Sequence, residues 1–78
     1  MLLFTTDSIE GKQITQYLGM GTGLGIDKSM PVAYNQAITQ LTEEATQAGA
    51  DAVIGIRVSA FGIQSYFGYN ISGTMVKL

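Results

Sequence analysis

The sequence predicts a two-layer α+β domain in which one helix packs on one face of a mostly antiparallel sheet. Apolar residues alternate with period two before residue 27, repeat every three or four residues in the middle of the chain, and alternate again after residue 51. Strands that are split by a single helix favour the order β-β-α-β-β in a two-layer fold. The chain has 78 residues and no linker, repeat or charge block, so we expect one domain over residues 1–78.

Two strands are expected before the helix. Residues 2–5 predict a short strand, and Gly11 supplies a left-handed residue for the turn that follows. Residues 13–26 predict a long strand with two unlike faces. One face carries Ile14, Gln16, Leu18, Met20, Thr22 and Leu24, and the other carries Thr15, Tyr17, Gly19, Gly21, Gly23 and Gly25.

The period changes over residues 31–48, which predict an amphipathic helix. Its apolar stripe consists of Tyr34, Ala37, Ile38, Leu41, Ala45 and Ala48. Ser29 is in the N-cap position, Pro31 fits the first turn, and Gly49 stands where a left-handed residue ends a helix. The polar residues of this segment lie mostly outside the stripe: Gln36, Gln40, Glu43, Glu44 and Gln47. We interpret the adjacent Glu43 and Glu44 as a solvated face.

Two further strands are expected after the helix. Residues 52–60 predict a strand with Ile54, Ile56 and Val58 on one face. We expect a turn over residues 62–68 and a last strand over residues 69–78.

The glycine-bearing face is the first candidate functional surface. A glycine within a strand costs about 0.5–1 kcal/mol relative to alanine, so four on one face call for a close approach by another group. That group could be the helix, an aromatic ring from Tyr34, Phe61 or Phe67, a neighbouring subunit, or a ligand. We take as the candidate oligomer or ligand surface Tyr17, Gly19, Gly21, Gly23, Gly25 and Arg57.

Arg57 is included because it is the only arginine and lies within an apolar strand. We expect it to pair with a carboxylate across a strand or a subunit boundary. The alternative is that its guanidinium binds an anionic ligand.

The composition excludes several kinds of site. The chain has no Cys and no His, which excludes disulfides, zinc sites of the Cys/His type and Cys or His nucleophiles. A net charge of −2 argues against a nucleic-acid partner. The glycine-rich stretch matches neither the dinucleotide-binding nor the phosphate-loop pattern, so we expect no cofactor. No apolar run reaches the ~18 residues of a membrane span, and we expect no membrane contact and a cytoplasmic location.

The low charge content favours self-association. Only 13% of the residues are charged, against about 25% in typical soluble domains. A surface this poor in charge is expected to be partly covered by another copy of the chain.

Three segments carry a family resemblance: residues 4–14 (FTTDSIEGKQI), residues 49–56 (GADAVIGI) and residues 71–77 (ISGTMVK). Together with Gly19, Thr22 and Gly23 in the second strand, they resemble the YbjQ-like family, which is described as a heavy-metal-binding domain of unknown function. The resemblance implies a fold similar to a dodecin subunit and a ring-shaped homopentamer. The chain resembles a shortened member, because residues 26–30 replace a longer segment of the family. No metal-binding residue of the family can be carried over to this sequence.

We therefore expect a non-enzymatic, self-assembling domain with a small molecule or ion bound at subunit boundaries. One alternative is a metal-binding protein that collects oxygen ligands such as Asp7, Glu10 or Asp51 from several subunits. Another is an enzyme without a recognisable motif, since no base–nucleophile pair is visible.

Overall fold

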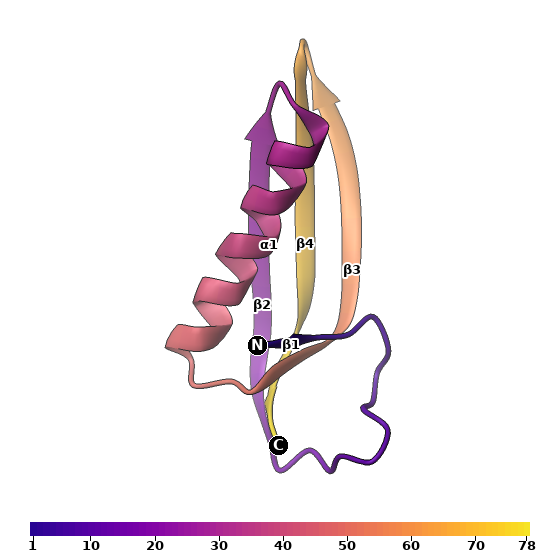
Figure 1. Cartoon of the computed structure of the whole chain (residues 1–78), viewed down its shortest axis with the longest axis vertical. Helices are drawn as coiled ribbons and strands as arrows, with labels where there is room; N and C mark the ends of the chain where they lie inside the picture. Colours follow the sequence, from indigo (N-terminus) through magenta and orange to yellow (C-terminus); the bar gives the residue numbers. More distant parts are fainter.

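The computed structural model describes all 78 residues and confirms the predicted fold class (Figure 1). Its elements are β1 (Leu2–Leu3), β2 (Gln16–Asp27), α1 (Met30–Gln47), β3 (Ala52–Ile63) and β4 (Tyr66–Lys77). The strands form one sheet in the order β1-β3-β4-β2. All pairs are antiparallel except β1 with β3, which is parallel.

The helix covers one side of the sheet only over β2 and β4, and β3 lies beside it (Figure 1). The main core lies beneath the helix and consists of Ala37, Leu41, Ala45, Val53, Ile56, Ile71 and Met75. A second, smaller core of Ala52, Ile54 and Val76 is packed against Phe4, Ile9, Ile14 and Leu78. The N-terminal segment therefore contributes a packing surface of its own.

The helix boundaries agree with the expected ones to within one residue. Ser29 is the N-cap residue in an extended conformation, but its side chain makes no capping hydrogen bond. Instead, Asp27 Oδ1 accepts a hydrogen bond of 2.9 Å from the Ser29 amide. Gly49 adopts φ +79° directly after the helix, so the predicted left-handed residue is confirmed.

The expected turn over residues 62–68 is wrong. Ile63 pairs with Tyr66, so β3 and β4 continue as a hairpin with only Gln64 and Ser65 between them. Gln64 takes φ +54° although it is not a glycine, which closes the turn. Aromatic residues such as Tyr66 and Phe67 favour strands, and here they extend the ladder beyond its predicted end.

The predicted single face of Ile54, Ile56 and Val58 is also corrected. Gly55 has φ +61°, and the pairing of β3 with β4 is irregular between Ile54 and Arg57. A bulge of this kind shifts the alternation of side chains by one residue. Ile54 consequently belongs to the smaller core, whereas Ile56 belongs to the main core under the helix.

Candidate functional site

Three of the predicted surface glycines lie beneath α1. Gly21, Gly23 and Gly25 are buried. A Cβ atom at Gly23 would collide with the carbonyl oxygen of Ala37, and one at Gly25 with the carbonyl oxygen of Ala33. The group that approaches these glycines is therefore the backbone of the chain's own helix. For these three positions, the expected oligomer or ligand surface is corrected to an intramolecular contact.

The other two β2 residues of that prediction remain on the surface. Tyr17 is 67% exposed, and Gly19 is exposed with φ +107° at a bulge between the two residues. No atom lies within 4 Å of a Cβ built at Gly19. Tyr17 is in register with Val76 of β4, whereas Arg57 is in register with Ser72 from the other side of that strand. The structure thus does not bring Tyr17 and Arg57 together.

Arg57 holds the N-terminal segment against β3. Its Nη1 atom donates hydrogen bonds of 3.1 Å to the carbonyl oxygens of Thr5 and Ile56. Within one chain, the guanidinium therefore bonds backbone carbonyls in place of the expected carboxylate. Pairing with a carboxylate of another copy, or with an anionic ligand, stays a prediction.

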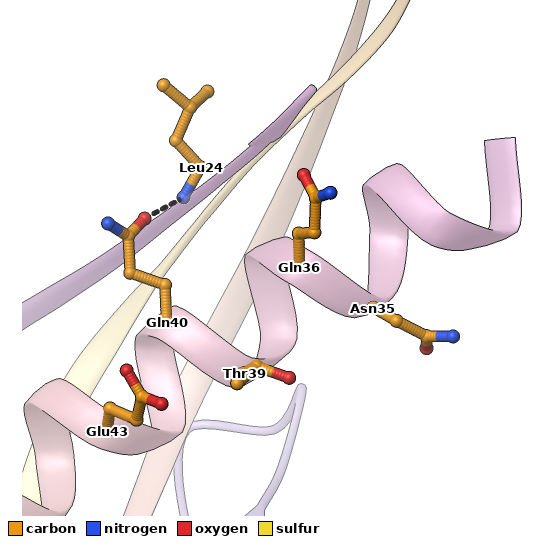
Figure 2. A pocket seen from close by; sticks show the side chains of 6 residues that line it. All are labelled: Leu24, Asn35, Gln36, Thr39, Gln40 and Glu43. Atoms are coloured by element: carbon orange, nitrogen blue, oxygen red, sulfur yellow. Dashed lines mark hydrogen bonds between the residues drawn. The ribbon is translucent and has the colours of Figure 1, made fainter. Parts of the chain in front are cut away.

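The outer edge of β2 is bonded by side chains of α1. Gln36, Gln40 and Glu44 are spaced by four residues, so they lie in one row along the helix. The outward amides of β2 donate to them: Ile26 N to Gln36 Oε1 at 3.1 Å, Leu24 N to Gln40 Oε1 at 2.5 Å and Thr22 N to Glu44 Oε2 at 3.1 Å. Figure 2 shows Gln40 reaching from the helix to the Leu24 amide. We call this row the edge clasp.

The sequence patterns do not predict the clasp. Glu44 is exposed, in agreement with the solvated face expected for Glu43 and Glu44, and its carboxylate also accepts the bond from the Thr22 amide. Gln36 and Gln40 lie outside the apolar stripe as expected and are likewise exposed. A signal was available in the spacing: the row at 36, 40 and 44 runs immediately beside the buried row Ala33, Ala37, Leu41 and Ala45. Long side chains that flank a core row in this way can reach past the edge of the sheet.

A shallow polar hollow of about 400 Å³ lies beside the clasp. It is lined by Leu24, Asn35, Gln36, Thr39, Gln40 and Glu43 (Figure 2). Gln36 and Gln40 point toward the strand, and Asn35 points away from it. The hollow thus offers amide, hydroxyl and carboxylate hydrogen-bonding groups, with one carboxylate as its only charge.

The opposite edge of the sheet is open. The N-terminal segment covers β3 only as far as the bonds from Gly55 N to Thr6 O and from Ile56 N to Phe4 O. Residues 57–63 pair with β4 on one side and with no strand on the other, and all seven are exposed (Figure 1). In an antiparallel pair, every second residue directs its N–H and C=O away from the partner strand. We call residues 57–63 the open edge.

Apolar side chains surround the open edge. Val58 is 47% and Ile63 is 53% exposed. A groove of about 300 Å³ is lined by Met30, Ala60, Phe61, Gly62, Phe67, Gly68 and Tyr69. Lys28 lies 5.7 Å from the centre of the Tyr66 ring, near the hairpin turn. The chain therefore presents unpaired backbone groups and apolar surface at one place.

The acidic residues are dispersed. No group of three or more Asp, Glu, His or Cys side chains lies close enough to hold a metal ion together. Asp51 Oδ2 accepts a hydrogen bond of 2.9 Å from the Leu78 amide. No helix in the structure is long and apolar enough to span a membrane.

Comparison with known proteins settles the family. Residues 25–78 match the YbjQ-like family model, which carries the description "Putative heavy-metal-binding". The chain belongs to the YbjQ-like family. A UPF0145 protein of Persephonella marina is 33% identical to it over 97% of each chain. A UPF0145 protein of Methanocaldococcus jannaschii is 42% identical over 76% of this chain and 60% of its own length.

The same comparisons bear on the length and the fold of this YbjQ-like chain. Its alignment with the Persephonella marina protein has 100 positions for 78 residues, so the chain is a shortened member, as expected. A crystal structure of a protein of unknown function from Pediococcus pentosaceus, assigned to the DUF74 family, superposes with a TM-score of 0.73 over 100% of this chain and 97% of that one. At 15% identity, this likeness shows the fold alone.

Proposed function

We propose that this YbjQ-like chain is a non-enzymatic domain that assembles with copies of itself through the open edge of β3. The observation that carries the proposal is the run of seven exposed, unpaired residues at 57–63. Soluble proteins usually protect such an edge with lysine, proline or a covering segment, because it accepts strands from other chains. This edge has none of these, and its one charged residue, Arg57, bonds the chain's own backbone.

The shape of the molecule supports the same proposal. The chain measures 43 × 22 × 16 Å, and its radius of gyration is 13.1 Å. A compact chain of this length has a radius of gyration of about 11–12 Å. The excess comes with a β3–β4 hairpin whose end carries Phe61, Ile63 and Tyr66 in exposed positions. An extended arm with apolar side chains suits contact with a second copy better than contact with water.

A ring of five copies is the form that the family resemblance implies. A ring requires a head-to-tail contact between two different surfaces of the same chain. In such a ring, the open edge of β3 would contact a surface of the next copy other than its β2 edge, whose amides are bonded by the helix. The apolar groove beside the open edge would then lie at a subunit boundary, where we place the small-molecule or ion site.

Native mass spectrometry and light scattering at micromolar concentration test the proposal. We expect the wild type to form a species of several copies and V58K to lower the mass toward 8.3 kDa. A lysine in the open edge adds a charge where the strands of two copies would meet. T39K is the matched control, because Thr39 is exposed on the helix, and it should assemble like the wild type. A wild type that stays at 8.3 kDa would overturn the proposal.

The description of the family model favours a second candidate, a metal-binding protein. Since no three acidic side chains converge within one copy, the ligands would have to come from several copies around the ring. Calorimetric titration of the assembled wild type with divalent ions tests this candidate. Heat of binding with an increase in melting temperature would support it, and their absence would remove it.

A further inference from the structure

The edge clasp has a consequence for which partners the sheet accepts. A sheet of this order has two outer edges, β2 on one side and the β1–β3 side on the other. Each offers backbone groups to an added strand. Outward amides of β2 are occupied by Gln36, Gln40 and Glu44, whereas on β3 the N-terminal segment bonds only the amides of Gly55 and Ile56 and leaves residues 57–63 open.

We infer that the edge clasp guards β2 against strand addition and thereby directs the pairing of a further strand to the open edge of β3. The partner excluded from β2 is an extended β-strand, which a second copy presents in its own residues 57–63. An antiparallel or parallel neighbour requires the amides of β2 as donors. While the clasp holds Thr22, Leu24 and Ile26, these donors are unavailable.

The clasp covers the second half of β2, from Thr22 to Ile26. The three bonded amides are spaced by two residues, which is the repeat of outward-facing groups along one strand. The three acceptors are spaced by one helical turn. These two repeats stay in step because Gly23 and Gly25 bring the helix backbone against β2. The close contact of the helix with Gly23 and Gly25 therefore places its polar row within reach of the β2 amides.

The guard also explains how assembly through β3 can remain finite. A chain with two accepting edges can add copies at both and grow into an open fibre. A chain with one accepting edge and one guarded edge cannot extend its sheet in both directions. The limit on assembly rests on the proposed self-assembly, whereas the occupation of the β2 amides is a property of the single chain.

Hydrogen exchange followed by NMR tests the clasp at the level of single amides. In Q40M the side chain keeps its size but loses the acceptor, and we expect the Leu24 amide to exchange about tenfold faster. Q40E retains a carboxyl acceptor and should restore slow exchange. N35A is the control, since Asn35 points away from the strand and accepts no bond from it. Equal exchange of Leu24 in Q40M and the wild type would overturn the inference.

The triple variant Q36M/Q40M/E44M tests the guarding role. We expect it to form larger species than the wild type in light scattering and to bind thioflavin T, because β2 then accepts strands. An unchanged mass distribution with accelerated exchange would show that the row bonds the edge without guarding it, and would overturn the inference. A monomeric wild type with an assembling triple variant would overturn the proposed function while supporting the guard, so the two failures are distinguishable.

Discussion

The close contact between β2 and α1 can be tested by replacing the glycines of β2 one at a time with alanine. The structure ranks the positions. At Gly21, an added Cβ would lie 3.0 Å from Leu41 Cδ1 and 3.2 Å from the Met75 side chain, both of which can move. At Gly23 and Gly25 it would collide with backbone carbonyls of the helix and lie 2.9 Å and 2.8 Å from backbone nitrogens. These backbone atoms cannot make room for a Cβ atom unless the whole helix moves away from β2.

The expected magnitudes follow from two opposing terms. Alanine in a strand gains about 0.5–1 kcal/mol over glycine in chain entropy. Overpacking a core costs about 1–3 kcal/mol, and more where the neighbour cannot move. G23A and G25A should therefore lower the free energy of unfolding by about 3 kcal/mol, whereas G21A should change it by less than about 1 kcal/mol. For a chain of this length, the larger loss is a sizeable share of a total of about 4–12 kcal/mol.

Urea unfolding followed by far-UV circular dichroism measures these differences. All variants are compared at one protein concentration, because assembly adds to apparent stability. T39A is the control, because Thr39 is exposed on the helix and lies outside the open edge. An unfolding free energy for G25A within about 0.5 kcal/mol of the wild type, which is the scatter of neutral surface substitutions, would refute the placement of the helix on the glycine face.

Two further substitutions probe the core and the end of the helix. L41A removes the largest fully buried side chain of the helix and should cost about 2–5 kcal/mol, read from urea unfolding; an unchanged transition would contradict the core assignment. G49A forces a left-handed conformation at φ +79° on a residue with a Cβ and should cost about 1–2 kcal/mol. The melting temperature of G49A should be several degrees below that of the wild type, measured at the same protein concentration and with the same mass of the assembled species. An equal or higher melting temperature would contradict the left-handed conformation of Gly49.

Much of the fold could be predicted because it depends on local patterns. The helix stripe around Leu41, the stop at Gly49 and the alternation along β2 are all properties of short segments. The end of β3 could not be predicted in the same way. Gly62 and Gly68 indicated a turn, but cross-strand pairing of residues up to Ile63 and Tyr66 outweighed that local signal.

The candidate site also combines features that local sequence patterns indicate with features that only the tertiary structure decides. The run of glycines in β2 indicated that some group comes close, and this was correct. The identity of that group was not encoded in the run itself, because the helix, an aromatic ring and a second subunit all fit a smooth strand face. Likewise, Gln36 and Gln40 look solvated on a helix considered alone. They become hydrogen-bond acceptors only once the helix lies along the edge strand.

The sequence by itself determined the fold class, the helix and its ends, the absence of Cys and His chemistry and the resemblance to the YbjQ-like family. Only the tertiary structure decided that α1 fills the glycine face, that its polar row closes the β2 edge and that residues 57–63 leave β3 open. The physical reason is the sequence separation of the residues that interact. Periodicity and caps arise from neighbours within a few residues, whereas contacts such as that of Leu24 with Gln40 exist only after distant segments pack together.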